Sequence, residues 1–293
     1  MRRRFTPDGP YDLARSLLLG DRGRRDLTLW WPAPGRLLRA SHTPEGPVTA
    51  ALELAGSQLE AEAWGPGAAW LLDALPGLLG LDDRPPRFSG KLGRVQRELP
   101  GVRMTRAVDL FEVLSSYVIR QRVAWRDALA SQRAILRAHA EPAPGPGELR
   151  LPLTPEQWRS LSTAELAGFG IERKRAATIL ELARRADRIR SWASLPSQTF
   201  GARLEALPGI GPWTRAMVQG HALGVLDVVP LGDYELPSAV AWFFAGEARA
   251  NDARMLELLE PFAGQRFRVL RLLWAAGLHA PRFGPRKRAT RFS

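Results

Sequence analysis

The sequence predicts an α+β protein in which a small antiparallel sheet with a few helices comes first and a wholly helical part follows. Between residues 27 and 64, short segments rich in strand-forming residues alternate with Pro/Gly turns. In the last of these segments Leu59, Ala61 and Ala63 alternate with glutamates, as expected of an antiparallel strand with one buried face. Beyond Pro100 the apolar residues recur instead with the period of a helix. These two patterns define the fold class.

The N-terminal part is predicted to hold one sheet and two helices. We expect strands at residues 27–31, 36–40, 48–54 and 58–64, and helices at residues 13–19 and 68–79. The three arginines at positions 2–4 are interpreted either as a solvated terminus or as a contact with DNA.

A long helix is predicted over residues 109–137. Its apolar side chains form one stripe at helical spacing, made of Leu110, Val113, Leu114, Tyr117 and Val118. Prolines interrupt the pattern at residues 141–147, which predicts a loop.

The second half of the chain is expected to consist of shorter helices. Capping boxes at residues 154–157 and 162–165 begin two of them. A basic amphipathic helix is predicted next, at residues 173–188. Three further helices are predicted at residues 234–244, 252–259 and 266–278.

The composition favours a polyanionic partner and excludes cysteine chemistry. The 293 residues carry a formal net charge of +12, which suits nucleic acid, although a solvated surface or an arginine bias also explains it. There is no cysteine, so disulfides, thiolate catalysis and cysteine-bound zinc or iron–sulfur clusters are excluded. The four histidines are scattered without metal-ligand spacing. No apolar run reaches membrane-spanning length, so we expect no membrane partner and a soluble cytoplasmic protein associated with the nucleoid.

The stretch LPGIGPWT, at residues 207–214, predicts an anion-binding hairpin. Gly209 and Gly211 flank one aliphatic residue, which lets the backbone turn tightly and leaves amide N–H groups uncovered. An apolar run at residues 216–225 predicts a helix directly afterwards, with Pro212 tolerated in its first turn. Free N–H groups and the positive end of a helix favour an anion there. In a basic protein the expected anion is a DNA phosphate.

This hairpin, with Trp213 inside it and Asp233 twenty residues further on, resembles that of the helix-hairpin-helix DNA glycosylases. The resemblance is closest to their DNA-3-methyladenine glycosylase II branch. Weaker similarities lie at residues 9–12, at 109–114 with Gln121 after them, and at 170–177.

The resemblance implies a division of the chain. Residues 1–98 would form an accessory α+β domain, and residues 99–281 an all-α helix-hairpin-helix glycosylase core with its cleft between two helical subdomains. Residues 282–293 would form a basic tail that adds affinity for phosphate.

Asp233 is the candidate catalytic residue. Departure of a base leaves a sugar with oxocarbenium character, and a fixed carboxylate stabilises that cation and orients or deprotonates the incoming water. The alternative is that Asp233 caps the helix expected from Tyr234, and one residue can do both.

The positions of the lysines bear on the reaction type. Glycosylases that also cut the DNA backbone form a Schiff base through a lysine, which in this family stands at the position of Trp213. The chain has no lysine between Lys174 and Lys287. The resemblance therefore implies a monofunctional hydrolase that leaves an abasic site.

The resemblance places Trp213 and Trp274 in the base pocket. Electron-rich rings attract cationic alkylated purines by about 0.5–2 kcal/mol. Tyr234 is expected in the pocket wall or in the core. Met217 stands where the best-known member of the branch has an aromatic residue, so a different base preference is expected. For both tryptophans the alternative is ordinary core packing.

DNA phosphates are expected at the backbone amides of Gly209, Gly211 and Trp213, with help from Thr214 and Arg215.

A second DNA contact is expected at Gln121 and Arg122. Arg122 follows Gln121 where the family places the side chain that fills the gap left by the flipped nucleotide. The alternative for Arg122 is an exposed helix residue. The resemblance also implies a Na⁺ or K⁺ ion at the backbone carbonyls of Leu207 and Ile210, and no other cofactor.

The expected function is that of a monomeric, monofunctional glycosylase that flips alkylated purines such as 3-methyladenine and 7-methylguanine out of duplex DNA. This reaction begins base excision repair. One alternative is a related glycosylase for deaminated or mismatched bases such as hypoxanthine or uracil. The other is a non-catalytic protein that keeps the hairpin only for binding DNA.

Overall fold

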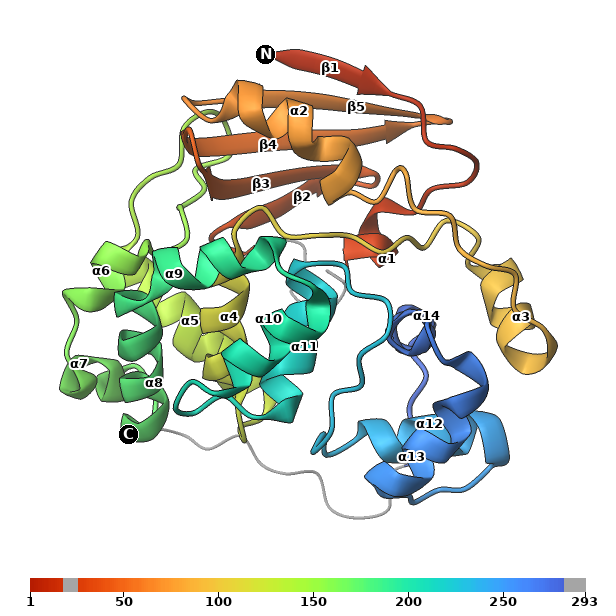
Figure 1. Cartoon of the computed structure of the whole chain (residues 1–293). Helices are drawn as coiled ribbons and strands as arrows, with labels where there is room; N and C mark the ends of the chain where they lie inside the picture. The colour runs from red at the N-terminus through yellow and green to blue at the C-terminus, as the bar shows by residue number, and fades with distance from the viewer. Residues whose placement is uncertain (18–25, 282–293) are drawn as a thin grey trace.

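The computed structural model describes residues 1–17 and 26–281, which form a sheet region and a helical region (Figure 1). The sheet region comprises β1 (Arg2–Phe5), α1 (Leu13–Leu17), β2 (Leu29–Ala33), β3 (Arg36–Thr43), β4 (Gly46–Ala55), β5 (Gln58–Trp64) and α2 (Ala68–Leu78). The α+β class is therefore confirmed. None of the described helices is long and apolar enough to cross a membrane.

The five strands form one antiparallel sheet in the order β1-β5-β4-β3-β2. The four predicted strands are confirmed, although β2 begins at Leu29, two residues later than expected. The edge strand β1 was not predicted, because three successive arginines show no apolar alternation. Its partner β5 lies far away in the sequence, and Arg3 stands opposite Ala61.

The sheet is covered on both faces. On one face Leu37 of β3 and Leu52 of β4 pack with Leu71 of α2 in a shared hydrophobic cluster. On the other face the next residue of β3, Leu38, packs with Leu149 from the loop segment that follows α5. The period of two along each strand thus separates two apolar layers.

The helical region contains α3 to α14 (Figure 1). Its elements are α3 (Gly90–Glu98), α4 (Leu110–Arg120), α5 (Trp125–His139), α6 (Pro155–Arg159), α7 (Thr163–Gly168), α8 (Arg173–Arg184), α9 (Ala186–Ser191), η2 (Trp192–Ser194), α10 (Ser197–Glu205), α11 (Pro212–Ala222), α12 (Leu236–Ala245), α13 (Asp252–Leu259), η3 (Glu260–Phe262) and α14 (Arg266–Ala275).

Both capping boxes are confirmed. The hydroxyl of Thr154 accepts a hydrogen bond from the Gln157 amide while the Gln157 side chain accepts one from the Thr154 amide. Ser162 and Glu165 form the same reciprocal pair at the start of α7. These signals are local, so the sequence locates them without knowledge of the tertiary structure.

The single helix predicted over residues 109–137 is wrong. The chain leaves helical geometry after α4 and resumes it in α5, and Arg122 between them has a φ of 57°. The apolar stripe ends at Val118 and does not reveal this break, and Val123 beyond the break still packs against the helical core. The helix predicted over residues 173–188 is likewise divided, at Arg185.

Two further differences are a missed helix and a helix that ends early. Helix α3 was not predicted, and α14 ends at Ala275, three residues earlier than expected. Residues 18 and 19 of the first predicted helix lie outside the described residues, as do residues 282–293 of the basic tail.

Two hydrophobic clusters organise the helical region. One is built mainly from α4, α5, α8, α10 and α11, and the other from α3 and α12 to α14. Met217 packs against both clusters, and Leu92 of α3 belongs to the second. Leu231 and Leu236, which flank Asp233 in the sequence, pack in the second cluster.

Candidate active site

The predicted hairpin connects α10 with α11. Its aliphatic residues Leu207 and Ile210 are buried in the helical core and anchor the turn. The amide of Ile210 donates to the carbonyl of Leu207 (3.1 Å). Gly209 has a φ of 83°, and a Cβ atom there would collide with the side chain of Thr178. Both the backbone conformation and the packing therefore require glycine at this position.

Helix α11 begins directly after the hairpin. Gly211 is extended and occupies the N-cap position, and Pro212 is the first helical residue, as predicted. The first amides of an α-helix have no partner within the helix, so the amides of α11 face the hairpin without intrahelical acceptors.

Gln121, in the non-helical segment between α4 and α5, is hydrogen-bonded to the hairpin. Its Nε2 donates to the carbonyl of Gly209 (2.9 Å) and to Oγ1 of Thr214 (2.8 Å). Thr214 is buried, with 2% exposure, so its hydroxyl serves this internal contact. The next residue, Arg122, is exposed and has a positive φ, a strained conformation for a side chain with a Cβ. The structure thus brings Gln121, Arg122 and the hairpin together.

Arg215 lies one turn into α11. Its guanidinium forms an ion pair with Glu205 at the end of α10 (2.9 Å). This charge is partly neutralised within the protein.

Asp233 occupies the loop between α11 and α12, and both of its carboxylate oxygens accept hydrogen bonds. Oδ1 accepts from the amides of Glu235 and Leu236 (both 2.9 Å), at the start of α12. Oδ2 accepts from Nε1 of Trp213 (2.7 Å). The capping interpretation is therefore correct in part: Oδ1 accepts from the first amide of α12, but the helix begins at Leu236 instead of Tyr234, and Glu235 occupies the N-cap position. Through the other oxygen the carboxylate is hydrogen-bonded to the indole of Trp213 in the hairpin. The Asp233 side chain is only half-buried.

Aromatic side chains continue from Trp213 towards α14. The ring of Tyr117 meets Trp213 edge-on, with centroids 5.7 Å apart. The Tyr117 hydroxyl lies 3.0 Å from Nδ1 of His221. The His221 ring stacks on Trp274 with centroids 5.8 Å apart. We call Trp213, Tyr117, His221 and Trp274 the aromatic row, and it places the two predicted pocket tryptophans in one continuous cluster.

Tyr117 and His221 were not predicted as site residues. Tyr117 was assigned to the buried stripe of the helix, and it is indeed buried, with 6% exposure. A signal for His221 exists in the sequence, because positions 213, 217 and 221 are four residues apart and share one face of α11. Met217 belongs to that face, and its carbonyl lies 3.1 Å from Nδ1 of His221.

Arg120 lies behind the aromatic row. Its guanidinium is 4.8 Å from the ring centroid of Tyr117 and 4.2 Å from that of Trp125. Burial lowers the pKa of Arg120, while the hydrogen bond and charge interaction with Tyr117 oppose this effect. The other flanking residue of the site, Tyr234, is 85% exposed and does not belong to the core.

Solved proteins of similar architecture include DNA glycosylases. No protein-family model matches the chain. A 3-methyladenine DNA glycosylase from Archaeoglobus fulgidus superposes with a TM-score of 0.81 at 18% identity, covering 93% of this chain and 97% of that one. An 8-oxoguanine glycosylase/lyase from Clostridium acetobutylicum, solved with double-stranded DNA, gives 0.68 at 13% identity, over 94% and 97% of the two chains.

Two further relatives are 3-methyladenine glycosylases. A 3-methyladenine DNA glycosylase of Schizosaccharomyces pombe, solved with abasic DNA, has a TM-score of 0.52 at 18% identity, covering 64% of this chain and 91% of that one. By sequence, DNA-3-methyladenine glycosylase 2 of Escherichia coli is 26% identical over 199 residues, which span 67% of this chain and 69% of the relative.

The chain therefore has the fold of these DNA glycosylases. Its curated homologue within that group is DNA-3-methyladenine glycosylase 2, which confirms the resemblance to this branch.

Proposed function

We propose that the chain is a monofunctional DNA glycosylase that hydrolyses the bond between an alkylated purine and deoxyribose in duplex DNA. The homologue from Escherichia coli is named for 3-methyladenine, as are two of the structural relatives. Relatives solved with DNA support double-stranded DNA as the partner. The helical region would then be the helix-hairpin-helix core, and the domain division at residue 98 is kept as part of the proposal.

The observation that carries this proposal is the setting of Asp233. Its carboxylate is held by N–H donors from α12 and from Trp213, and the side chain remains half-buried at the protein surface. A carboxylate fixed in this way requires little reorganisation when a positive charge develops beside it. We propose that it stabilises the oxocarbenium-like sugar and orients the attacking water.

The proposed base pocket is formed around the aromatic row. Rings of tryptophan and tyrosine stabilise a cationic purine by stacking and cation–π attraction, on the order of 0.5–2 kcal/mol per favourable contact. Trp213, Trp274, Met217 and the exposed Tyr234 are proposed to contact the base. Met217 supplies a flexible, polarizable side chain where the aromatic residue was expected, so its shape adapts to more than one base.

Neither of the two lysines in the described part of the chain is proposed as a nucleophile. Lys91 lies 3.4 Å from the carbonyl oxygens of Phe243 and Phe244, at the C-terminal end of α12. Asp233 binds the opposite end of this helix, whose ten residues extend about 15 Å. Lys174 belongs to the first turn of α8 and is exposed. Hydrolysis without a Schiff base is therefore the proposed route.

Phosphate binding is proposed at the hairpin. The amides of Gly209, Gly211 and Trp213 would bind the DNA backbone, with Gln121 holding the hairpin in place and Arg122 entering the duplex beside it. A Na⁺ or K⁺ ion at the carbonyls of Leu207 and Ile210, and a monomeric state, remain part of the proposal.

The proposal is tested by replacing Asp233 with asparagine. DNA methylated at purines is incubated with each protein, and abasic sites are cleaved with alkali and counted. Asn can still cap α12 but has no negative charge, so we expect D233N to release bases about 10²–10⁴-fold more slowly at unchanged melting temperature.

Asp252→Asn is the matched control. The Asp252 carboxylate accepts a hydrogen bond from the amide of Gly232 (2.8 Å), directly beside Asp233, but does not contact the aromatic row. Full activity of D252N with loss in D233N would support the proposal. Equal release by wild type and D233N would remove Asp233 as the catalyst, and absence of release from wild type would favour the binding-protein alternative.

A further inference from the structure

Arg120, the last residue of α4, carries a positive charge beside the aromatic row. Its Cζ lies over the ring of Tyr117, 4.8 Å from the centroid, and 4.2 Å from the ring centroid of Trp125. No carboxylate forms an ion pair with Arg120 in the described part of the chain. An arginine side chain remains protonated at neutral pH even when burial lowers its pKa. Two aromatic rings therefore hold an unneutralised cation at this position.

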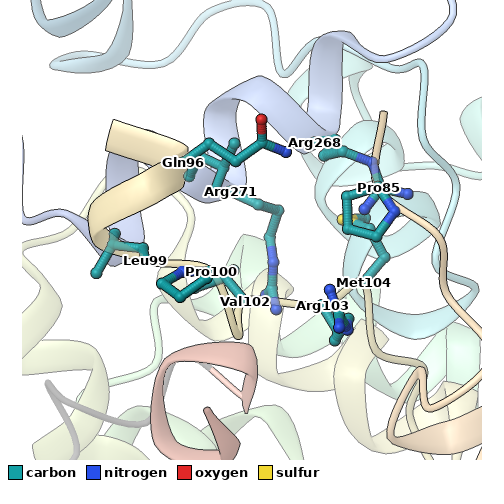
Figure 2. Close-up of a pocket in the computed structure, with 10 residues that line it drawn as sticks. Pro85, Gln96, Leu99, Pro100, Val102, Arg103, Met104, Arg268 and Arg271 are labelled. Carbon is teal, nitrogen blue, oxygen red and sulfur yellow. The ribbon is translucent and has the colours of Figure 1, made fainter. Parts of the chain in front are cut away.

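Arg271 of α14 is a second positive group near the same tyrosine. Figure 2 shows its side chain, which is only 3% exposed, extending from α14. Its guanidinium donates to the carbonyl of Ser16, while the carboxylate of Asp83 accepts from both terminal nitrogens of Arg268 (2.7 and 2.6 Å). Burial lowers the pKa of Arg271 to about 10, and the charge interaction with Tyr117 opposes this change. Arg271 is therefore charged at neutral pH and interacts with Tyr117.

Asp233 supplies negative charge at the Trp213 end of the aromatic row, where its carboxylate accepts from the indole (2.7 Å). One carboxylate and two guanidinium groups thus flank the neighbouring rings of Trp213 and Tyr117. The Tyr117 ring is also occupied, because Arg120 lies over it and His221 packs against it with centroids 5.5 Å apart. This ring therefore adds little attraction for a second cation.

The repulsion from Arg120 is comparable with the attraction of one ring. The two distances from the Tyr117 centroid, 4.8 Å to Cζ of Arg120 and 5.7 Å to the Trp213 centroid, place Arg120 within about 10.5 Å of the Trp213 ring. At about 10 Å, with an effective dielectric constant near 20 and physiological salt, a unit charge changes the affinity for a cation about 2–15-fold. Cation–π attraction to one ring is equivalent to about 2–30-fold.

We infer that Arg120, together with Arg271, determines the base specificity of the proposed pocket by cancelling its preference for cationic purines. Selection then depends on shape and stacking. The substrates therefore include uncharged alkylated purines, such as the cyclic etheno adduct of adenine, as well as cationic ones. This inference rests on the proposed function and deepens it.

The inference is tested with two bases of equal shape and different charge. One duplex contains 7-methylguanine, which is cationic, and the other contains 7-deaza-7-methylguanine, in which carbon replaces the charged nitrogen. Both carry a 2′-fluoro sugar, which slows base release, and binding is measured by fluorescence anisotropy. We expect the wild type to bind the two duplexes with affinities within about threefold of each other.

Arg120→Met removes the charge and keeps an unbranched side chain. We expect R120M to favour the cationic duplex about 2–15-fold more than the wild type does. Arg120→Lys keeps the charge and should keep the wild-type ratio. Arg137→Met is the matched control, because it removes one positive charge at an exposed position near the other end of α5. R137M should also keep the wild-type ratio.

An unchanged ratio in R120M would overturn the inference. An equal loss of affinity for both duplexes, with a smaller dependence on salt, would overturn it as well, because it would show that Arg120 binds a DNA phosphate. If R120M does not fold, the wild type decides the question, and a preference of more than about tenfold for the cationic duplex contradicts the inference.

Release of ordinary 7-methylguanine, measured in parallel, separates this inference from the proposed function. Release by the wild type with an unchanged ratio in R120M would contradict the inference alone. A ratio that changes in R120M, without release of any base by the wild type, would contradict the proposed reaction and support the role of Arg120.

Discussion

Two parts of this basic protein use arginine in opposite ways. In the edge strand β1, Arg2 and Arg4 form ion pairs with Glu62 and Glu60 of β5 (both 2.9 Å), and Arg3 pairs with Asp73 of α2. These charges are neutralised within the protein. These pairs favour the interpretation of the three arginines as a solvated terminus over that of a DNA contact.

The hairpin region, which we define as residues 207–214 with Gln121 and Arg122, is organised differently. Its polar groups are mostly backbone amides and carbonyls held in place by Gln121, and Arg122 is exposed in a strained conformation. A net charge of +12 therefore does not locate an anion site, because ion pairing decides which charges are available. Four substitutions, from the largest expected effect to the smallest, test this contrast.

The largest effect is expected for Trp213→Phe, which keeps an aromatic ring and removes the donor to Asp233. A hydrogen bond to a charged group contributes about 1.5–3 kcal/mol. If this bond orients the carboxylate in the transition state, base release should fall about 10–100-fold, and loss of the bond should also lower the melting temperature by several degrees. Trp192→Phe in η2 is the control, because the Trp192 ring lies against Arg188 and Arg203. Equal activity of W213F and W192F would show that the bond has no catalytic role.

The next effect is expected for Gln121→Ala. This substitution removes two hydrogen bonds between the α4–α5 break and the hairpin, each contributing about 0.5–1.5 kcal/mol. We expect a lower melting temperature and DNA affinity reduced about 5–30-fold, measured by fluorescence anisotropy with an abasic duplex. Gln58→Ala, at an exposed end of β5, should change neither quantity. If Q121A is less stable but binds DNA with full affinity, the hydrogen bonds of Gln121 to the hairpin do not contribute to DNA binding.

A smaller effect is expected for Arg122→Ala. Loss of one phosphate contact should weaken binding several-fold and reduce the slope of log affinity against log salt by about one. The slope is measured from titrations over a range of salt concentrations. An unchanged slope together with weaker binding would indicate that Arg122 contacts a base or fills the duplex instead of pairing with phosphate.

The smallest effect is expected for Arg3→Ala. The exposed pair of Arg3 with Asp73 should contribute no more than about 1 kcal/mol to stability. DNA affinity and its salt dependence should match those of the wild type. A reduced salt slope in R3A would show that β1 exchanges its carboxylate partners for DNA, and the contrast between the two regions would disappear.

Much of this arrangement was predictable because it depends on neighbours in the sequence. The alternation of Leu59, Ala61 and Ala63 determined which face of β5 is buried, and all three are at most 2% exposed. The capping residues Thr154 and Ser162 determined where two helices begin. The glycines of LPGIGPWT predicted the turn that α10 and α11 flank. The resemblance also singled out Asp233, whose role in catalysis remains a prediction.

The contacts between residues that are far apart in the sequence could be known only from the tertiary structure. Tyr117 and His221 are 104 positions apart, and Arg271 and Ser16 are 255 apart. The break after Arg120 and the pairing of β1 likewise depend on distant partners. Rules of local conformation act over a few residues, whereas the energy of a buried contact depends on whatever side chain the folded chain places opposite. The sequence by itself therefore determined four of the five strands, the two capping boxes and the hairpin, and only the folded chain determined the edge strand β1, the aromatic row and the buried arginines.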